Sequence, residues 1–161
     1  MLHKPKQYRL LQTSSQLLDM KYQAIIVSDL HLGIKDSKAD EFIEFLDTHP
    51  TDLLILNGDI IDGWALNRGA KWKKKHTKVI SKILKLSNKT QIIWIRGNHD
   101  EFIQEFIGTN FGHIEIKEDY VLNTKTWVED DVYRNERYYI FHGDVVDVFI
   151  TKYKWLSKIG A

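Results

Sequence analysis

Three short apolar runs alternate along the chain with two amphipathic segments, and this order constrains the fold more than any other feature. The runs are 24–27, 53–56 and 92–95, and each is rich in β-branched residues or leucine. Runs of this length and content are typical of buried strands. Because a strand–helix–strand–helix–strand order produces right-handed crossovers, the sequence predicts an α/β fold with a mainly parallel sheet flanked by helices.

The two amphipathic segments between these runs predict the flanking helices. The first helix is expected over 38–49, ended by Pro50, and the second over 71–86, ended near Asn88. Their apolar stripes consist of Phe42, Ile43, Phe45 and Leu46 in the first segment and Val79, Ile80, Ile83 and Leu84 in the second. One face of each helix is therefore expected to pack on the sheet.

Three further strands are predicted in the second half of the chain. A fourth strong run covers 138–141, and two shorter strands are expected at 114–116 and 126–128, either antiparallel or in a second sheet. No internal repeat, proline- or serine-rich linker or low-complexity block divides the sequence. We therefore expect residues 1–161 to form a single domain.

Composition excludes several kinds of site. The 161 residues include no cysteine, so disulfides, thiolate metal sites and cysteine nucleophiles are excluded. The 23 basic residues nearly balance the 22 acidic ones, so no global field draws the molecule onto nucleic acid. The sequence shows no secretion signal and no apolar run of roughly 20 residues, and a cytoplasmic location is expected.

Residues of the types that bind metals follow each of the four strong runs. They are Asp29 and His31, Asp59, the segment 97–100, and His142. Loops that leave the carboxyl ends of parallel strands lie along one edge of a sheet, so these clusters are expected to converge. Carboxylate, amide and imidazole donors without thiolate suit manganese, iron, zinc or magnesium.

The order of these motifs resembles that of calcineurin-like phosphoesterases. Asp-x-His at 29–31, Gly-Asp at 58–59, Gly-Asn-His-Asp at 97–100 and His-Gly-Asp at 142–144 are similar to the metal-binding motifs of that family. The resemblance implies a metallophosphoesterase sandwich, with a mainly parallel sheet flanked by helices. It also implies two divalent metal ions, with manganese favoured by analogy and iron, zinc or magnesium as the alternatives.

The resemblance assigns five metal ligands. It implies that Asp29 and His31 bind one ion, that Asn98 and His142 bind the other, and that Asp59 bridges both. A shared carboxylate offsets the repulsion between two cations about 3.5–4 Å apart. The resemblance then makes a hydroxide held between the ions the nucleophile, with no covalent protein intermediate.

A catalytic role is implied for His99, which by resemblance faces the phosphate and donates a hydrogen bond or a proton to the leaving group. Asp100 is expected to orient its imidazole ring. Asp62 and Asp144 lie beside the assigned ligands and could support them, but acids in polar loops are more often solvated, so both are left outside the expected site. The histidines for which no role is expected are His3, His49, His76 and His113.

Details of the motifs point to one group within the family. The segment 28–33 and the short run before His142 look most like the UDP-2,3-diacylglucosamine diphosphatase group, which cleaves a nucleotide-sugar pyrophosphate in lipid A synthesis. His99, however, stands where those enzymes commonly have Arg. Asp100 stands where protein phosphatases have Glu, which disfavours that activity. A broader phosphodiesterase or nuclease is the alternative.

The expected partner is a phosphorylated small molecule or a lipid-linked nucleotide, and nucleic acid is not expected. The lysine-rich segment 71–75 could meet anionic substrate or lipid headgroups, which would bring the protein to the inner face of the membrane as a peripheral protein. The oligomeric state is left open by the sequence.

One motif of the family is missing, because no histidine follows His142 and the later Gly-His-x-His motif is absent from the sequence. The matched residues then give three protein ligands for each metal, with Asp59 counted twice. We expect weaker metal binding and a domain that is incomplete at its C-terminal end. A non-catalytic binding fragment is the third functional hypothesis.

Overall fold

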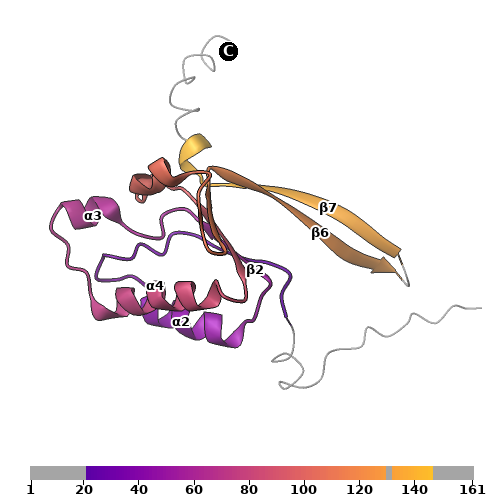
Figure 1. Cartoon of the computed structure of the whole chain (residues 1–161), viewed down its shortest axis with the longest axis horizontal. Helices are drawn as coiled ribbons and strands as arrows, with labels where there is room; N and C mark the ends of the chain where they lie inside the picture. The colour runs from indigo at the N-terminus through magenta and orange to yellow at the C-terminus, as the bar shows by residue number, and fades with distance from the viewer. Residues whose placement is uncertain (1–20, 130–131, 147–161) are drawn as a thin grey trace, which may run out of the picture.

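A computed structural model of the chain describes residues 21–129 and 132–146 (Figure 1). Its elements in chain order are β1 (Ile25–Val27), α2 (Ala39–Thr48), β2 (Leu53–Asn57), α3 (Gly63–Asn67), α4 (Lys74–Leu86), β3 (Gln91–Ile95), the 3-10 helix η1 (Glu101–Phe106), β4 (Asn110–Phe111), β5 (Ile114–Lys117), β6 (Asp119–Glu129) and β7 (Val132–Phe141). Among the described residues, no helix is long and apolar enough to cross a membrane.

Five strands form the main sheet, in the order β1-β2-β3-β5-β4. β1, β2, β3 and β5 run parallel to their neighbours, and β4 pairs with β5 in the antiparallel direction. The first three apolar runs and the strand predicted at 114–116 all belong to this sheet. The mostly parallel α/β architecture is therefore confirmed, and the carboxyl ends of β1, β2 and β3 share one edge.

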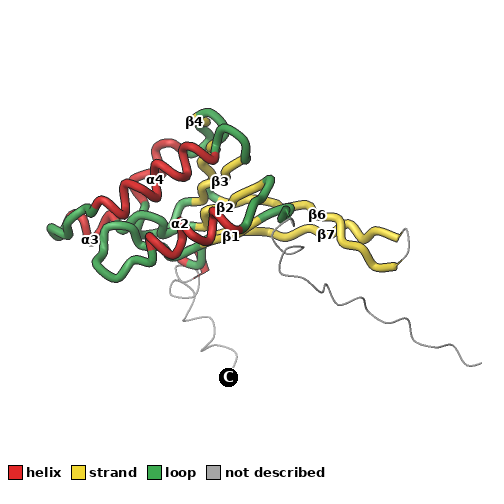
Figure 2. Tube along the Cα trace, turned by 90° about the horizontal axis from the view of Figure 1, so that it is seen from below, coloured by secondary structure: helices red, strands yellow, loops and turns green. Residues whose placement is uncertain are grey.

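Helices α2 and α4 cover one face of the main sheet (Figure 2). The buried residues that join the helices to the sheet include Phe42 and Leu46 of α2, Val79 and Ile83 of α4, and Leu54, Leu56 and Ile92 of the strands. Both predicted helices are confirmed, although α4 begins at Lys74 because Lys73 is still extended. Leu84, predicted in the apolar stripe, is 54% exposed. Val79 and Ile83, four residues apart, lie on the face of α4 that packs on the sheet, and Leu84 lies off that face.

The β6–β7 hairpin packs on the opposite face of the sheet and then extends beyond the body of the molecule (Figure 1). Its Leu122 and Ile140 form a second apolar cluster with Leu53, Ile55, Ile93 and Ile95. The fourth strong run, 138–141, does not join the parallel sheet and is the last part of β7, while 126–128 lies within β6. The main sheet thus lies between a helical layer and a β-hairpin.

Backbone hydrogen bonds join the loops that follow β1 and β2. The His31 N–H donates to the Asp59 carbonyl (2.9 Å), and the Leu32 N–H donates to the Ile60 carbonyl (2.8 Å). The Asp62 N–H donates back to the Leu32 carbonyl (2.8 Å). These bonds hold the two loops side by side at the carboxyl edge of the sheet.

The Asp100 carboxylate joins the loop after β3 to the loop after β2. Its side chain is fully buried. One oxygen accepts from the Gly97 N–H (2.6 Å), and the other accepts from the Ile60 N–H (3.0 Å) and from Trp94 Nε1–H (3.2 Å). Three donors satisfy this buried charge without a counter-ion.

His76 is a buried histidine at the start of α4. Its Nδ1 accepts from the Lys73 N–H (3.2 Å), so the ring helps to cap the helix. Burial, followed by the charges of Lys75 and Lys73, lowers the pKa of His76 below its ordinary value. The Ile34 carbonyl and the Asp40 carboxylate oppose this shift without reversing it. The fold therefore favours a neutral ring here.

Replacing Asp100 by Asn should destabilise the protein by about 2–3 kcal/mol. An amide side chain has one acceptor oxygen, so its NH₂ group would face N–H donors that it cannot satisfy. The free energy of unfolding is measured from urea denaturation. Asp36→Asn, a change at an exposed acid, is the control. Equal unfolding free energies for the two variants would contradict the loop-joining role of Asp100.

Replacing His76 by Gln should weaken the acid sensitivity of folding. Because the pKa of His76 is lowered in the folded state, the unfolded chain binds the proton more readily. The contribution of the neutral ring is complete above the unfolded pKa of about 6.5 and is lost as the pH falls below it. Gln still accepts the capping N–H but does not titrate.

Thermal midpoints measured between about pH 8 and pH 5 should therefore fall more steeply for the wild type than for His76→Gln. His113→Gln, at an exposed position, controls for the loss of a histidine. Wild-type and His76→Gln curves that run parallel over this range would refute the capping role of the neutral ring.

Candidate metal centre

Three of the predicted ligands adopt a backbone conformation that is rare for residues other than glycine. Asp29, His31 and Asp59 have φ angles of 56°, 46° and 55°, in the left-handed region. The first two follow β1 and the third follows β2, at the edge where these parallel strands end. Strained residues of this kind cluster at functional sites, where the surrounding structure holds them.

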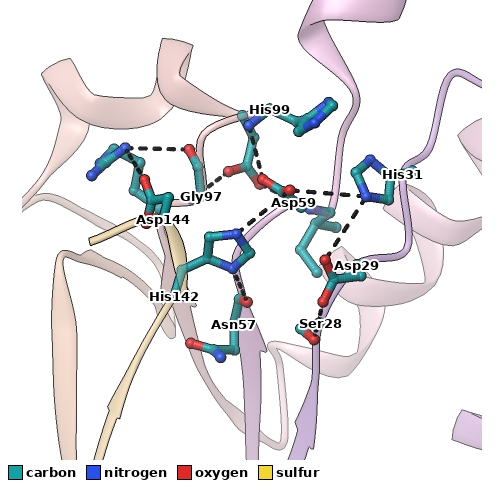
Figure 3. Close-up of polar contacts among 12 residues, drawn as sticks. Ser28, Asp29, His31, Asn57, Asp59, Gly97, His99, His142 and Asp144 are labelled. Carbon is teal, nitrogen blue, oxygen red and sulfur yellow. Dashed lines mark hydrogen bonds and ion pairs between the residues drawn. The ribbon is translucent and has the colours of Figure 1, made fainter. Parts of the chain in front are cut away.

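The donor atoms of four predicted ligands face one another (Figure 3). Asp59 Oδ2 lies 3.5 Å from His142 Nε2 and 3.9 Å from His31 Nε2. Asp29 Oδ1 lies 3.9 Å from the same His31 nitrogen, and its other oxygen accepts from the Ser28 hydroxyl. Asp59 and His142 are buried, whereas Asp29 is exposed, so the group opens to solvent on its Asp29 side.

These spacings fit a divalent cation. Two donors that bind one cation at about 2.0–2.2 Å can lie no more than about 4.4 Å apart. The separations of 3.5 and 3.9 Å fall within that limit and are longer than ordinary hydrogen bonds. The residues present therefore suit a metal ion.

The His142 ring has the tautomer that a metal ligand needs. Its Nδ1 lies 3.0 Å from the Asn57 carbonyl, which can only accept a hydrogen bond. Nδ1 therefore carries the proton, and in the neutral ring the Nε2 lone pair faces Asp59. A backbone carbonyl behind a ligating histidine is a common way to fix the orientation of the ring.

Two glycines allow these side chains to approach the backbone closely. Gly58 has a φ of 75°, and a Cβ there would overlap the His142 ring. A Cβ at Gly97 would overlap the carboxylate and the backbone nitrogen of Asp59. Any larger residue at either position would therefore displace a predicted ligand.

Asn98 is brought to the same place by its neighbours. Gly97 packs against Asp59, and the His99 N–H donates to Asp59 Oδ1 (2.8 Å). The Asn98 side chain is half-buried. The division of the ligands between two ions, with Asn98 and His142 on the second, stays a prediction.

Asp62, and not Asp100, is the carboxylate beside the His99 ring. The role expected of Asp100 is therefore wrong, and its two oxygens accept from Gly97, Ile60 and Trp94 instead. Asp62 Oδ1 lies 3.1 Å from His99 Nδ1, and Asp62 Oδ2 lies 3.3 Å from His31 Nδ1. Burial alone would raise the pKa of Asp62, but the contact with His99, the Ala65 amide and the charges of both histidines hold it below its ordinary value.

Asp62 was expected to be a solvated acid, yet it is buried at the centre of the site. Asp62 lies three residues after Asp59 and is the N-cap of the short helix α3. No helix was predicted over 63–67, so the capping role of Asp62 could not be inferred.

The two residues after Asp62 also contact His99. The Gly63 N–H donates to the His99 carbonyl (2.9 Å), and the Trp64 ring lies against the imidazole, with ring centroids 4.3 Å apart. The His31 ring approaches His99 edge-on, at a centroid distance of 4.6 Å. The imidazole is therefore enclosed by a carboxylate, an indole and a second imidazole.

Asp144 has a structural role at the margin of the site. Its carboxylate pairs with Arg96 (3.2 Å), which also pairs with Glu118 (3.7 Å). Arg96 directly follows β3, and Asp144 lies three residues beyond the end of β7. This ion pair ties the end of the hairpin, and with it His142, to the main sheet.

Comparisons with known proteins identify the family. No curated protein matches the sequence. Among solved structures, the chain is similar to the Pseudomonas putida nuclease MPE, with 23% identity and a TM-score of 0.41, and the match covers 62% of this chain and 50% of that chain. The chain thus spans about half the length of that protein. The family model for calcineurin-like phosphoesterases matches residues 22–160, and the chain belongs to this family.

Proposed function

We propose that the chain is a metal-dependent phosphoesterase that hydrolyses a phosphate anhydride or ester at the group formed by Asp29, His31, Asp59 and His142. One observation carries this proposal: carboxylate and imidazole donors from three separate segments face one another at spacings of 3.5 and 3.9 Å. We propose two bound ions bridged by Asp59, with Asn98 on the second ion. Manganese is favoured by family analogy over iron, zinc and magnesium.

Bound cations would lower the pKa of a water molecule that attacks phosphorus and would stabilise the charge on the phosphoryl oxygens. The protein contributes the geometry. Asp59 presents Oδ2 to both His31 and His142, while the His99 N–H holds Oδ1. Because the His99 N–H holds one carboxylate oxygen, the other is kept directed at the two imidazole rings, and little reorganisation is needed during the reaction.

His99 is the proposed donor to the leaving group. The Asp62 carboxylate lies 3.1 Å from Nδ1, so it would favour a proton on that nitrogen and leave Nε2 as the nitrogen that can serve the substrate. Asp62 would also stabilise the charged imidazolium. The same carboxylate contacts His31, so it fixes a proposed ligand and the proposed acid together.

The finer proposal is a lipid-linked nucleotide anhydride as substrate, as for UDP-2,3-diacylglucosamine diphosphatases. A hollow of about 350 Å³ is lined by Tyr139, Phe141, Val145 and Val146, with Glu118 and Asp119 at its polar side. Phe141 directly precedes His142 in the sequence, so the hollow and a proposed ligand share one stretch of chain. An acyl chain could be buried there, and such a substrate would bring the protein to the membrane surface.

A phosphodiesterase or nuclease is the second candidate. The segment 64–75 exposes Trp64 together with several cations, a combination that suits stacked bases and phosphates. Faster manganese-dependent cleavage of single-stranded DNA than of a nucleotide-sugar pyrophosphate would favour this candidate. Metal binding without turnover of either substrate would favour the binding fragment.

Asp59→Asn should lower manganese-dependent hydrolysis of bis(p-nitrophenyl) phosphate at least about a hundredfold. Asn keeps an oxygen for the His99 N–H but replaces the anionic oxygen that faces His31 and His142. Metal content, measured by mass spectrometry of the eluted ions, should fall as well. Asp144→Asn is the matched control, and equal losses in two folded variants would contradict the central role of Asp59.

His99→Gln should lower turnover about a hundredfold while metal content stays nearly unchanged. Gln retains the backbone N–H that holds Asp59, and it removes the ring that would donate to the leaving group. Turnover and metal content are measured on the same preparation. A stoichiometric loss of metal would show that His99 is a ligand instead.

A further inference from the structure

Trp64 lies against His99, the residue proposed to donate to the leaving group. Its ring centroid is 4.3 Å from that of His99, and the two planes are inclined by 36°. Trp64 is nevertheless 43% exposed, so part of the indole faces solvent. Because His99 is the proposed donor to the leaving oxygen, a group attached to that oxygen would approach the indole.

The indole is fixed together with the imidazole. Trp64 belongs to the first turn of α3, whose N-cap is Asp62, the residue that also contacts His99 Nδ1. The Gly63 N–H holds the His99 carbonyl, and a Cβ at Gly63 would come within 2.9 Å of that oxygen. Three consecutive residues therefore fix one ring against the other, and little side-chain entropy remains to be lost when a ligand binds.

Resting on the proposed phosphoesterase function, we propose that Trp64 is a specificity-determining residue that stacks on a planar aromatic ring in the leaving group. A preorganised, half-exposed indole offers a flat surface with favourable dispersion and quadrupole interactions. A saturated ring of the same size would meet that surface with fewer close contacts. Packing on His99 alone would give Trp64 no such preference.

Trp72 provides an internal comparison. It is 40% exposed and is fixed as well, through Nε1–H to Thr77 Oγ1 (2.8 Å) and an edge contact with His76 at a centroid distance of 5.1 Å. Neither contact involves a residue of the proposed centre. Trp72 thus shares the exposure and the order of Trp64 but not its position beside His99.

Benzyl phosphate and cyclohexylmethyl phosphate form a matched pair of probes, because their leaving alcohols differ mainly in the planarity of the ring. The kcat/KM for each is measured by phosphate release with manganese for the wild type, Trp64→Leu, Trp64→Phe and Trp72→Leu. Trp64→Leu should lower the value for the benzyl ester about tenfold more than for the cyclohexylmethyl ester, which corresponds to about 1.4 kcal/mol. Trp64→Phe should keep most of the preference, and Trp72→Leu should keep all of it.

Binding supplies a second measurement that does not depend on turnover. The indole N–H resonances of the five tryptophans would be recorded in a nitrogen–proton NMR spectrum, and those of Trp64 and Trp72 would be assigned from their variants. Benzyl phosphate should shift the Trp64 resonance more than cyclohexylmethyl phosphate does, and should leave that of Trp72 in place.

The two proposals fail in different ways. Equal losses of kcat/KM for both esters in Trp64→Leu, together with equal indole shifts, would overturn the specificity role and leave Trp64 as packing for His99. If the wild type hydrolyses neither ester, the phosphoesterase proposal fails for monoesters, and the indole shifts alone then decide whether Trp64 binds a planar ring.

Discussion

The buried carboxylate of Asp100 is the interaction on which the site geometry depends. It accepts hydrogen bonds from the backbone of two different loops and from the Trp94 indole, so it fixes the distance between the ends of β2 and β3. Ile60 and Gly97 are two of those donors. Ile60 directly follows Asp59, and Gly97 packs against it. A shift of either loop would therefore move the proposed bridging ligand. A second hydrogen-bonded side chain, Asp62, then extends this order to the histidines.

The strained conformations at the site are balanced by local hydrogen bonds. A left-handed φ at a residue other than glycine costs of order 1–3 kcal/mol, and a typical intramolecular hydrogen bond returns about 0.5–1.5 kcal/mol. Asp59 has a φ of 55°, and its carbonyl and its carboxylate both accept backbone hydrogen bonds. His31 has a φ of 46°, and its N–H supplies one of them. The strain and the bonds that hold it belong to the same residues.

The sequence predicted most of the fold and the convergence of the candidate residues, since the carboxyl ends of neighbouring parallel strands lie at one edge of a sheet. Their assignment as metal ligands stays a prediction. Four of the five predicted ligands face one another, although His142 arrives on an antiparallel hairpin and not on a fourth parallel strand. The support around His99 could not be predicted. Asp62 and Asp100 are both aspartates within three residues of a predicted ligand, and only their contacts in the folded structure distinguish them.

The donors of the proposed centre come from two layers of the molecule. Asp29 and Asp59 follow strands of the main sheet, and His142 follows the last strand of the hairpin. A cation bound there would act as a non-covalent cross-link between two layers, in addition to the small apolar cluster, the Arg96–Asp144 pair and the hydrogen bonds of Asn57 to the end of the hairpin. Since a ligand that binds only the folded state stabilises it by mass action, metal supply would then govern how firmly the hairpin is attached to the sheet, and not only whether the site can react.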